Sequence, residues 1–167
     1  LETLLVGHKT DLVSIMAANN ETGVLQPINE ISTLCEKHGA PLHMDFVQML
    51  GKSKIELNQI KARYFTFSGH KVGAPKGVGF LVVQGEGQLL YPLIHGKQQK
   101  ALRGGTENPL GIGMFGLIVK EMLKGWRPFP ENLRVFHHDF EAELLRLIPE
   151  TTIHGASSPR LLNASSI

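Results

Sequence analysis

The sequence predicts an α/β protein with a mainly parallel sheet and flanking helices. Short apolar runs typical of buried strands recur along the first half of the chain, and a helical stretch separates the first two. Polar or glycine-rich residues follow each of the first three runs. A strand, a helix and a second strand in this order form a right-handed crossover, which makes the two strands parallel.

The first strand and helix are predicted from "LVSIMA" at 12–17 and "QPINEISTLCEKHG" at 26–39. The polar turn "ANNETG" lies between them. Pro27 suits the first turn of the helix and Gly39 suits its C-terminal stop. The apolar residues share one face, which predicts burial of Ile28, Ile31, Leu34 and Cys35.

Further strands are predicted at 41–46 (PLHMDF), 62–69 (ARYFTFSG) and 77–84 (GVGFLVVQ), and helices at 109–123 and 131–147. "KGWRPFP" is a linker between these helices. "LETLL" is expected to end a helix, and "LLNASSI" to begin a strand. We therefore expect a piece of a longer protein that is inactive alone.

Composition excludes several classes of function. The net charge of +2 is too small to predict binding to nucleic acid or to an anionic membrane surface. No apolar run is long enough to span a bilayer. The single cysteine, Cys35, excludes an intramolecular disulfide and predicts a reducing, cytoplasmic location. The histidines form no HExxH or Cys-x-x-Cys pattern, so no metal site is predicted.

Polar side chains follow three successive predicted strands. The carboxyl ends of parallel strands meet at one edge, where ligands bind in open α/β sheets. We therefore expect one crevice to contain Asn19, Asn20, Asp45, Gln48, Ser68, His70 and Lys71.

This set has the chemistry of a pyridoxal-phosphate site. A lysine such as Lys71 can form a Schiff base with this carbonyl cofactor. Asp45 is placed to keep the pyridine nitrogen protonated, and Gln48 or Asn20 to bond the ring oxygen. Ser68 and the Gly69–His70 backbone supply phosphate donors.

Each residue also has a plain structural interpretation. Lys71 could be a solvated cation, Asp45 a helix cap, and His70 a hydrogen-bonded structural residue. The glycines of "SGHKVGAPKGVGF" could serve turns and bulges only. A nucleotide loop is excluded, because "GAPKGVG" lacks the Walker A ending and spacing.

Four ordered motifs carry a resemblance to a known family: "SIMAANNETGVLQPINEI", "HMDFVQMLGK", "FSGHKVGAPKGVGFLVV" and "LRGGTENPLGI". In order and spacing they resemble the cysteine desulfurase and selenocysteine lyase branch of the class-V aminotransferases. The resemblance covers about residues 13–113 and continues weakly to the end. It implies that 1–124 is part of the large, cofactor-binding domain of a fold-type I pyridoxal-phosphate enzyme. Residues 125–167 would be the linker and the start of the smaller C-terminal domain.

The resemblance also implies roles for single residues. Lys71 would be the Schiff-base lysine and, with His70, a catalytic residue. Asp45 would pair with the pyridine nitrogen, and Gln48 would bond the phenolic oxygen. Asn20 would lie by that oxygen and by the substrate carboxylate.

The remaining implied roles concern the phosphate and the substrate. Ser68, Gly69 and His70 would contact the phosphate, while Thr106 would reach the phosphate of the neighbouring subunit in a homodimer. Arg103 would bind substrate.

The implied activity is removal of sulfur from L-cysteine to give alanine and an enzyme persulfide, which a sulfur-acceptor protein could then receive. The alternatives are a selenocysteine lyase, another class-V lyase or epimerase, and a non-catalytic paralogue that only binds partners.

This sequence departs from the family pattern in three ways. "HGKQQKALRGGT" replaces a glycine-rich run, and Lys97 and Lys100 make that loop more basic. The residue that stacks on the cofactor ring would lie upstream of residue 1. The nucleophilic cysteine and the arginine for the substrate carboxylate would lie beyond residue 167. Cys35 is expected in the core and not as that nucleophile.

Overall fold

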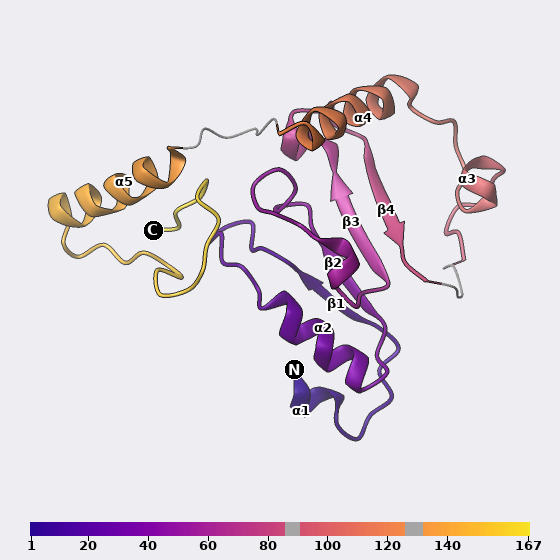
Figure 1. Cartoon of the computed structure of the whole chain (residues 1–167), viewed down its shortest axis with the longest axis horizontal. Coiled ribbons are helices and arrows are strands. Elements are labelled where there is room, and N and C mark those ends of the chain that lie inside the picture. Colours follow the sequence, from indigo (N-terminus) through magenta and orange to yellow (C-terminus); the bar gives the residue numbers. More distant parts are fainter. Residues whose placement is uncertain (86–90, 126–131) are drawn as a thin grey trace.

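A four-stranded sheet forms the centre of the chain, in the order β1-β2-β3-β4 (Figure 1). The structure, a computed structural model, describes residues 1–85, 91–125 and 132–167. The strands are β1 (Val13–Met16), β2 (Leu42–Asp45), β3 (Tyr64–Ser68) and β4 (Gly79–Val83). The first three are parallel and β4 is antiparallel to β3. The predicted α/β fold with a mainly parallel sheet is confirmed.

The helices near residues 26–39, 109–123 and 131–147 agree closely with the sequence prediction, but the short helix at 98–101 was not predicted. They are α1 (Glu2–Leu5), α2 (Ile28–Lys37), α3 (Gln98–Ala101), α4 (Pro109–Leu123) and α5 (Leu133–Leu147), with 3-10 turns η1 (Leu57–Gln59) and η2 (Gly69–Val72). The predicted start of α5 at 131 and most of the 124–130 linker lie outside the described residues. The strand expected in "LLNASSI" is not formed, and only an isolated bridge at Arg160 precedes it. No helix in the described residues is long and apolar enough to cross a membrane.

Helix α2 buries the predicted apolar face. Ile31 and Cys35 are buried, and Ile28 and Leu34 pack against the same core. The helix begins just after Pro27 and not at it. Gly39 follows its end at a φ of 65°, a conformation that glycine adopts without strain.

A buried polar residue on α2 was not foreseen. Ser32 is only 2% exposed, and its Oγ accepts a hydrogen bond of 2.7 Å from the backbone nitrogen of Lys61. This bond ties α2 to the segment that enters β3.

The two faces of the parallel strands differ in character. One face is apolar and is part of the core, with Val13, Leu42, Met44, Phe65 and Phe67 buried. The opposite face carries a polar row across three strands. The imidazole of His43 lies 2.7 Å from Ser14 Oγ and 3.1 Å from Thr66 Oγ1. These contacts set the lateral position of β2, which ends at Asp45.

Aromatic rings join the sheet to α4. The ring of Phe67 lies 5.9 Å from that of Phe46 and 4.6 Å from that of Phe80, between centroids. Phe80 in turn lies 5.1 Å from Phe115 of α4. Helix α4 thus packs close to the end of β3 (Figure 1), where the candidate site begins.

Candidate active site

The carboxyl ends of β1, β2 and β3 meet at one edge, as the sequence predicted. The backbone nitrogen of Ala17 donates to the oxygen of Asp45 at 2.8 Å, and that of Phe46 donates to the oxygen of Thr66 at 3.0 Å. These bonds continue the parallel ladder just past the strands. The loops that carry Asn20, Asp45 and Lys71 therefore leave the sheet side by side.

The two asparagines after β1 have different positions. Asn19 Oδ1 accepts hydrogen bonds of 2.9 Å from the backbone nitrogens of Glu21 and Thr22, so its side chain holds the turn together. Asn20 is exposed at the tip, and its amide has no hydrogen-bond partner in the described part of the chain. Of the pair, Asn20 has the side chain available for a ligand.

Asp45 is partly buried at the end of β2. Its Oδ1 accepts a hydrogen bond of 2.8 Å from the backbone nitrogen of Val47, which is a local capping contact. Its Oδ2 has no hydrogen-bond partner among the described residues. The capping interpretation therefore accounts for one oxygen and leaves the other open to a ligand.

Gln48 is linked to a lysine that sequence reasoning missed. Lys52 Nζ donates to Gln48 Oε1 at 2.9 Å. Burial lowers the pKa of the Lys52 ammonium, and the positive charge of Lys71 lowers it further. Lys52 therefore contacts Gln48 and lies within electrostatic range of Lys71. The only sequence signal for Lys52 was its spacing of four residues after Gln48.

Lys71 lies on the short turn η2, directly after β3. Gly69 is buried, and a Cβ there would lie 3.0 Å from Ala74 Cβ and 3.0 Å from Val78 Cγ1. Gly73 ends the turn at a φ of 93°. Close packing around Gly69 and the positive φ of Gly73 thus define the backbone of this turn. The Lys71 side chain is exposed on it.

The side chains next to Lys71 are arranged for a ligand outside the turn. Ser68 Oγ and His70 Nδ1 share a hydrogen bond of 2.8 Å. The Lys71 amine donates no hydrogen bond within the described residues. His70 and Lys71 are both exposed.

Thr106 and Arg103 lie in a different place. They line a cavity of about 750 Å³ together with residues of β4, such as Phe80 and Leu81. No hydrogen bond or ion pair among the described residues joins either one to Lys71. The helix that follows is capped by Asn108, whose Oδ1 accepts from the backbone nitrogen of Gly111 at 3.0 Å.

The basic segment before Arg103 contains α3 and has an unusual backbone. Gln99, Lys100 and Ala101 have φ values of 49°, 59° and 64°, in the left-handed region that costs about 1–2 kcal/mol per residue other than glycine. Gly96 and Gly104 close the loop, since a Cβ on Gly96 would lie 2.5 Å from Gly104 Cα. Because this sequence has Gln99, Lys100 and Ala101 where the family has a glycine-rich run, residues other than glycine adopt the left-handed conformation here.

The residues at the strand edge fit pyridoxal phosphate. The open Oδ2 of Asp45 matches a protonated ring nitrogen, and the adjacent cations Lys52 and Lys71 favour an anionic group between the loops. The exposed amine of Lys71 is available for a covalent bond to a carbonyl. No cluster of metal-binding side chains occurs in the ranges that the structure describes.

Comparison with known proteins identifies the family of this chain. The family model described as aminotransferase class-V matches residues 1–124. A cysteine desulfurase from Nostoc sp. (strain PCC 7120 / SAG 25.82 / UTEX 2576) is 38% identical over all of this chain and 42% of its own length. The cysteine desulfurase NifS of Azotobacter vinelandii is 35% identical over 93% of this chain and 39% of its own length.

A solved structure of a similar protein has the same fold as this chain. The X-ray structure of a NifS-like protein from Rickettsia africae superposes with a TM-score of 0.90 at 34% identity. The superposition covers 98% of this chain and 46% of the Rickettsia africae chain.

The chain belongs to the class-V aminotransferases, in the cysteine desulfurase branch of these pyridoxal-phosphate enzymes. It spans about two fifths of the length of the curated relatives it matches.

Proposed function

We propose that the full-length protein is a cysteine desulfurase that removes sulfur from L-cysteine and releases alanine. One structural observation carries the proposal: Lys71 is exposed on a tightly packed turn, at the same sheet edge as the open carboxylate oxygen of Asp45. The curated relatives that match this chain are named cysteine desulfurases, which supports the choice of reaction.

The cofactor in this proposal is pyridoxal phosphate, held covalently through Lys71 Nζ. When bound, this group withdraws electrons from the substrate and so labilises bonds at its α- and β-carbons. The chain's residues hold it by complementary charge and hydrogen bonding: Asp45 at the ring nitrogen, Gln48 and Asn20 at the ring oxygen, and Ser68, Gly69 and His70 at the phosphate.

Lys71 has a second role in this proposal. If the substrate amine displaced Lys71 Nζ from the cofactor, the freed lysine amine would be available to move protons at the substrate carbons. His70 lies next to it, where its hydrogen bond to Ser68 orients the ring.

The sulfur acceptor is not Cys35. Cys35 is 0% exposed, and burial raises the pKa of its thiol, so little thiolate forms and none reaches solvent. We therefore propose that another cysteine of the full-length protein takes the sulfur as a persulfide and passes it to an acceptor protein.

The proposal includes a cytoplasmic homodimer. Thr106 and Arg103 are exposed near β4 without a described contact to Lys71. This position suits a loop that completes a neighbouring subunit's site, with Thr106 at the phosphate and Arg103 at the substrate.

The test is to trap the cofactor in the full-length protein. Borohydride reduction followed by peptide mapping should place the label on Lys71, and Lys71→Ala should abolish both label and turnover. Lys76→Ala is the matched control, since Lys76 is an exposed lysine of the same loop. A label on Lys52 or Lys76 would overturn the assignment.

The reaction is tested by incubating the wild-type protein with cysteine and a thiol reductant. Alanine and sulfide should appear in equal amounts. A strong preference for selenocysteine would instead identify a selenocysteine lyase. Absence of turnover on either substrate, with Lys71 unlabelled, would identify a non-catalytic paralogue.

A further inference from the structure

The loop that carries Asn20 is a tight two-armed turn between β1 and α2. The backbone nitrogen of Asn19 donates to Val24 O at 2.8 Å, and Ala18 pairs with Leu25 in an antiparallel bridge. These contacts join the two arms of the turn, so the position of the returning arm constrains the position of Asn20.

That returning arm is paired with the far end of the chain. Leu25 N donates to Pro159 O and Leu161 N donates to Gly23 O, both at 2.8 Å, and Val24 pairs with Arg160 between them. The segment 159–161 thus lies antiparallel to the returning arm of the Asn20 turn and is hydrogen-bonded to it.

The pairing is close-packed. Leu161 is only 4% exposed and belongs to the core. A Cβ on Gly155 would lie 2.4 Å from Val24 Cγ2, so no larger residue fits there without displacing the turn.

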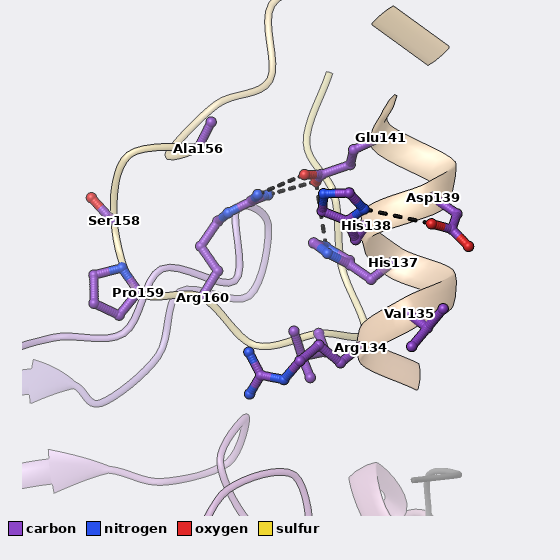
Figure 2. A pocket seen from close by; sticks show the side chains of 11 residues that line it. Arg134, Val135, His137, His138, Asp139, Glu141, Ala156, Ser158, Pro159 and Arg160 are labelled. Atoms are coloured by element: carbon purple, nitrogen blue, oxygen red, sulfur yellow. Dashed lines mark hydrogen bonds and ion pairs between the residues drawn. The ribbon is translucent and has the colours of Figure 1, made fainter. Parts of the chain in front are cut away.

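Arg160, at the centre of this 159–161 segment, forms an ion pair with a residue of α5. Figure 2 shows its guanidinium pointing to Glu141, with hydrogen bonds of 2.8 Å to both carboxylate oxygens. Ser165 Oγ donates to Glu141 Oε1 at 2.6 Å, and His137 Nε2 lies 3.4 Å from the same oxygen. The Arg160 and Glu141 side chains are 10% and 13% exposed.

We propose that the Glu141–Arg160 ion pair is a positioning element for Asn20, acting through the 159–161 segment. It couples helix α5 to the rim of the candidate active site. The inference rests on the proposed function only in assigning Asn20 to the cofactor and substrate. The connection itself is made of hydrogen bonds and contacts given above.

A bidentate ion pair is suited to holding a segment of backbone in one position. Two parallel hydrogen bonds fix both the distance and the angle of the guanidinium, and the surrounding burial protects them from screening. A purely stabilising pair would need no particular link to the Asn20 turn. Here the arginine backbone is itself the partner of that turn.

The experiment is a double-mutant cycle in the full-length holoprotein, with Arg160→Gln and Asn20→Ala. Three quantities are measured: the absorption band of bound pyridoxal phosphate as a function of pH, the KM for cysteine, and the thermal unfolding temperature. We expect Arg160→Gln to move the band and raise KM about fivefold, in the same direction as Asn20→Ala. The double variant should show no further change in the band or in KM.

The control is an ion pair on the same helix. Arg146 bonds Glu143 with both side chains more than half exposed, so Arg146→Gln should leave all three quantities unchanged. If Arg160→Gln does not fold, Ser165→Ala, which removes one hydrogen bond to Glu141, is used in the same cycle.

Two results would overturn the inference: full additivity of the two substitutions in the band and in KM, or a lowered unfolding temperature with both unchanged. A wild-type protein that binds the cofactor without releasing sulfur would overturn the proposed function alone. The absorption band of the bound cofactor would still measure the coupling between Arg160 and Asn20. Absence of cofactor binding would overturn both.

Discussion

The turn that carries Lys71 should be intolerant of a single added methyl group. In Gly69→Ala, the new Cβ would lie 3.0 Å from Ala74 Cβ, 3.0 Å from Val78 Cγ1 and 3.1 Å from Phe115 Cδ1. Optimal carbon–carbon separations are about 3.5–4.0 Å. The methyl group is therefore crowded on three sides.

The size of the effect follows from how little these neighbours can move. Phe115 is 3% exposed and Ala74 is 7% exposed, so both are held by the core. The turn is also closed by hydrogen bonds of 3.0 Å from Gly69 N to Val78 O and from Ala74 N to Gly69 O. Overpacking of this kind costs about 1–3 kcal/mol, and we expect about 2 kcal/mol of lost folding stability.

The assay is chemical denaturation of the full-length protein, with cofactor retention measured in parallel. Val78→Ala removes one of the crowding methyl groups, so the double variant should be less destabilised than the sum of the two single variants, by about 0.5 kcal/mol or more. Gly73→Ala is the contrast. Its φ is 93° but nothing lies within 4 Å of an added Cβ, so Val78→Ala should not relieve its backbone strain.

Two results would refute the packing argument. One is a Gly69→Ala protein as stable as the wild type with its cofactor fully bound. The other is strict additivity with Val78→Ala, which would mean that the methyl group never meets Val78.

Three further predictions concern charge and assembly. Asp45→Asn should lower turnover about 100-fold or more while weakening cofactor binding far less, because an uncharged amide no longer keeps the ring nitrogen protonated; near-normal turnover would mean that Asp45 is only a cap. Mixing Lys71→Ala with Thr106→Ala subunits should restore activity if Thr106 completes the partner's site, and should restore none if it serves its own chain. The Arg160 guanidinium holds the pKa of Glu141 at about 2, below its ordinary 4.5, so this carboxylate stabilises the fold above that ordinary value. The contribution, about 3 kcal/mol, should be lost as pH falls from about 5 to 2, and acid titration of stability in Glu141→Gln should lack that loss.

Local sequence patterns were enough to predict much of the fold. The apolar face and Gly39 stop of α2 depend on neighbours a few residues away along the chain, and the structure has both. The strand runs also ended where expected, near Asp45 and Ser68. Since parallel strands bring their carboxyl ends to one edge, the grouping of the Asn20, Asp45 and Lys71 loops followed from element order alone.

The tertiary structure decided what depends on distant residues. The antiparallel direction of β4, the bond from Lys61 to Ser32 and the approach of Lys52 to Lys71 have no local signal, because periodicity reports which face is buried and not what lies against it. The same holds for Arg160. Its partners Val24 and Glu141 are more than a hundred residues apart along the chain. Only the folded backbone brings a surface-type arginine between them, with its side chain 10% exposed.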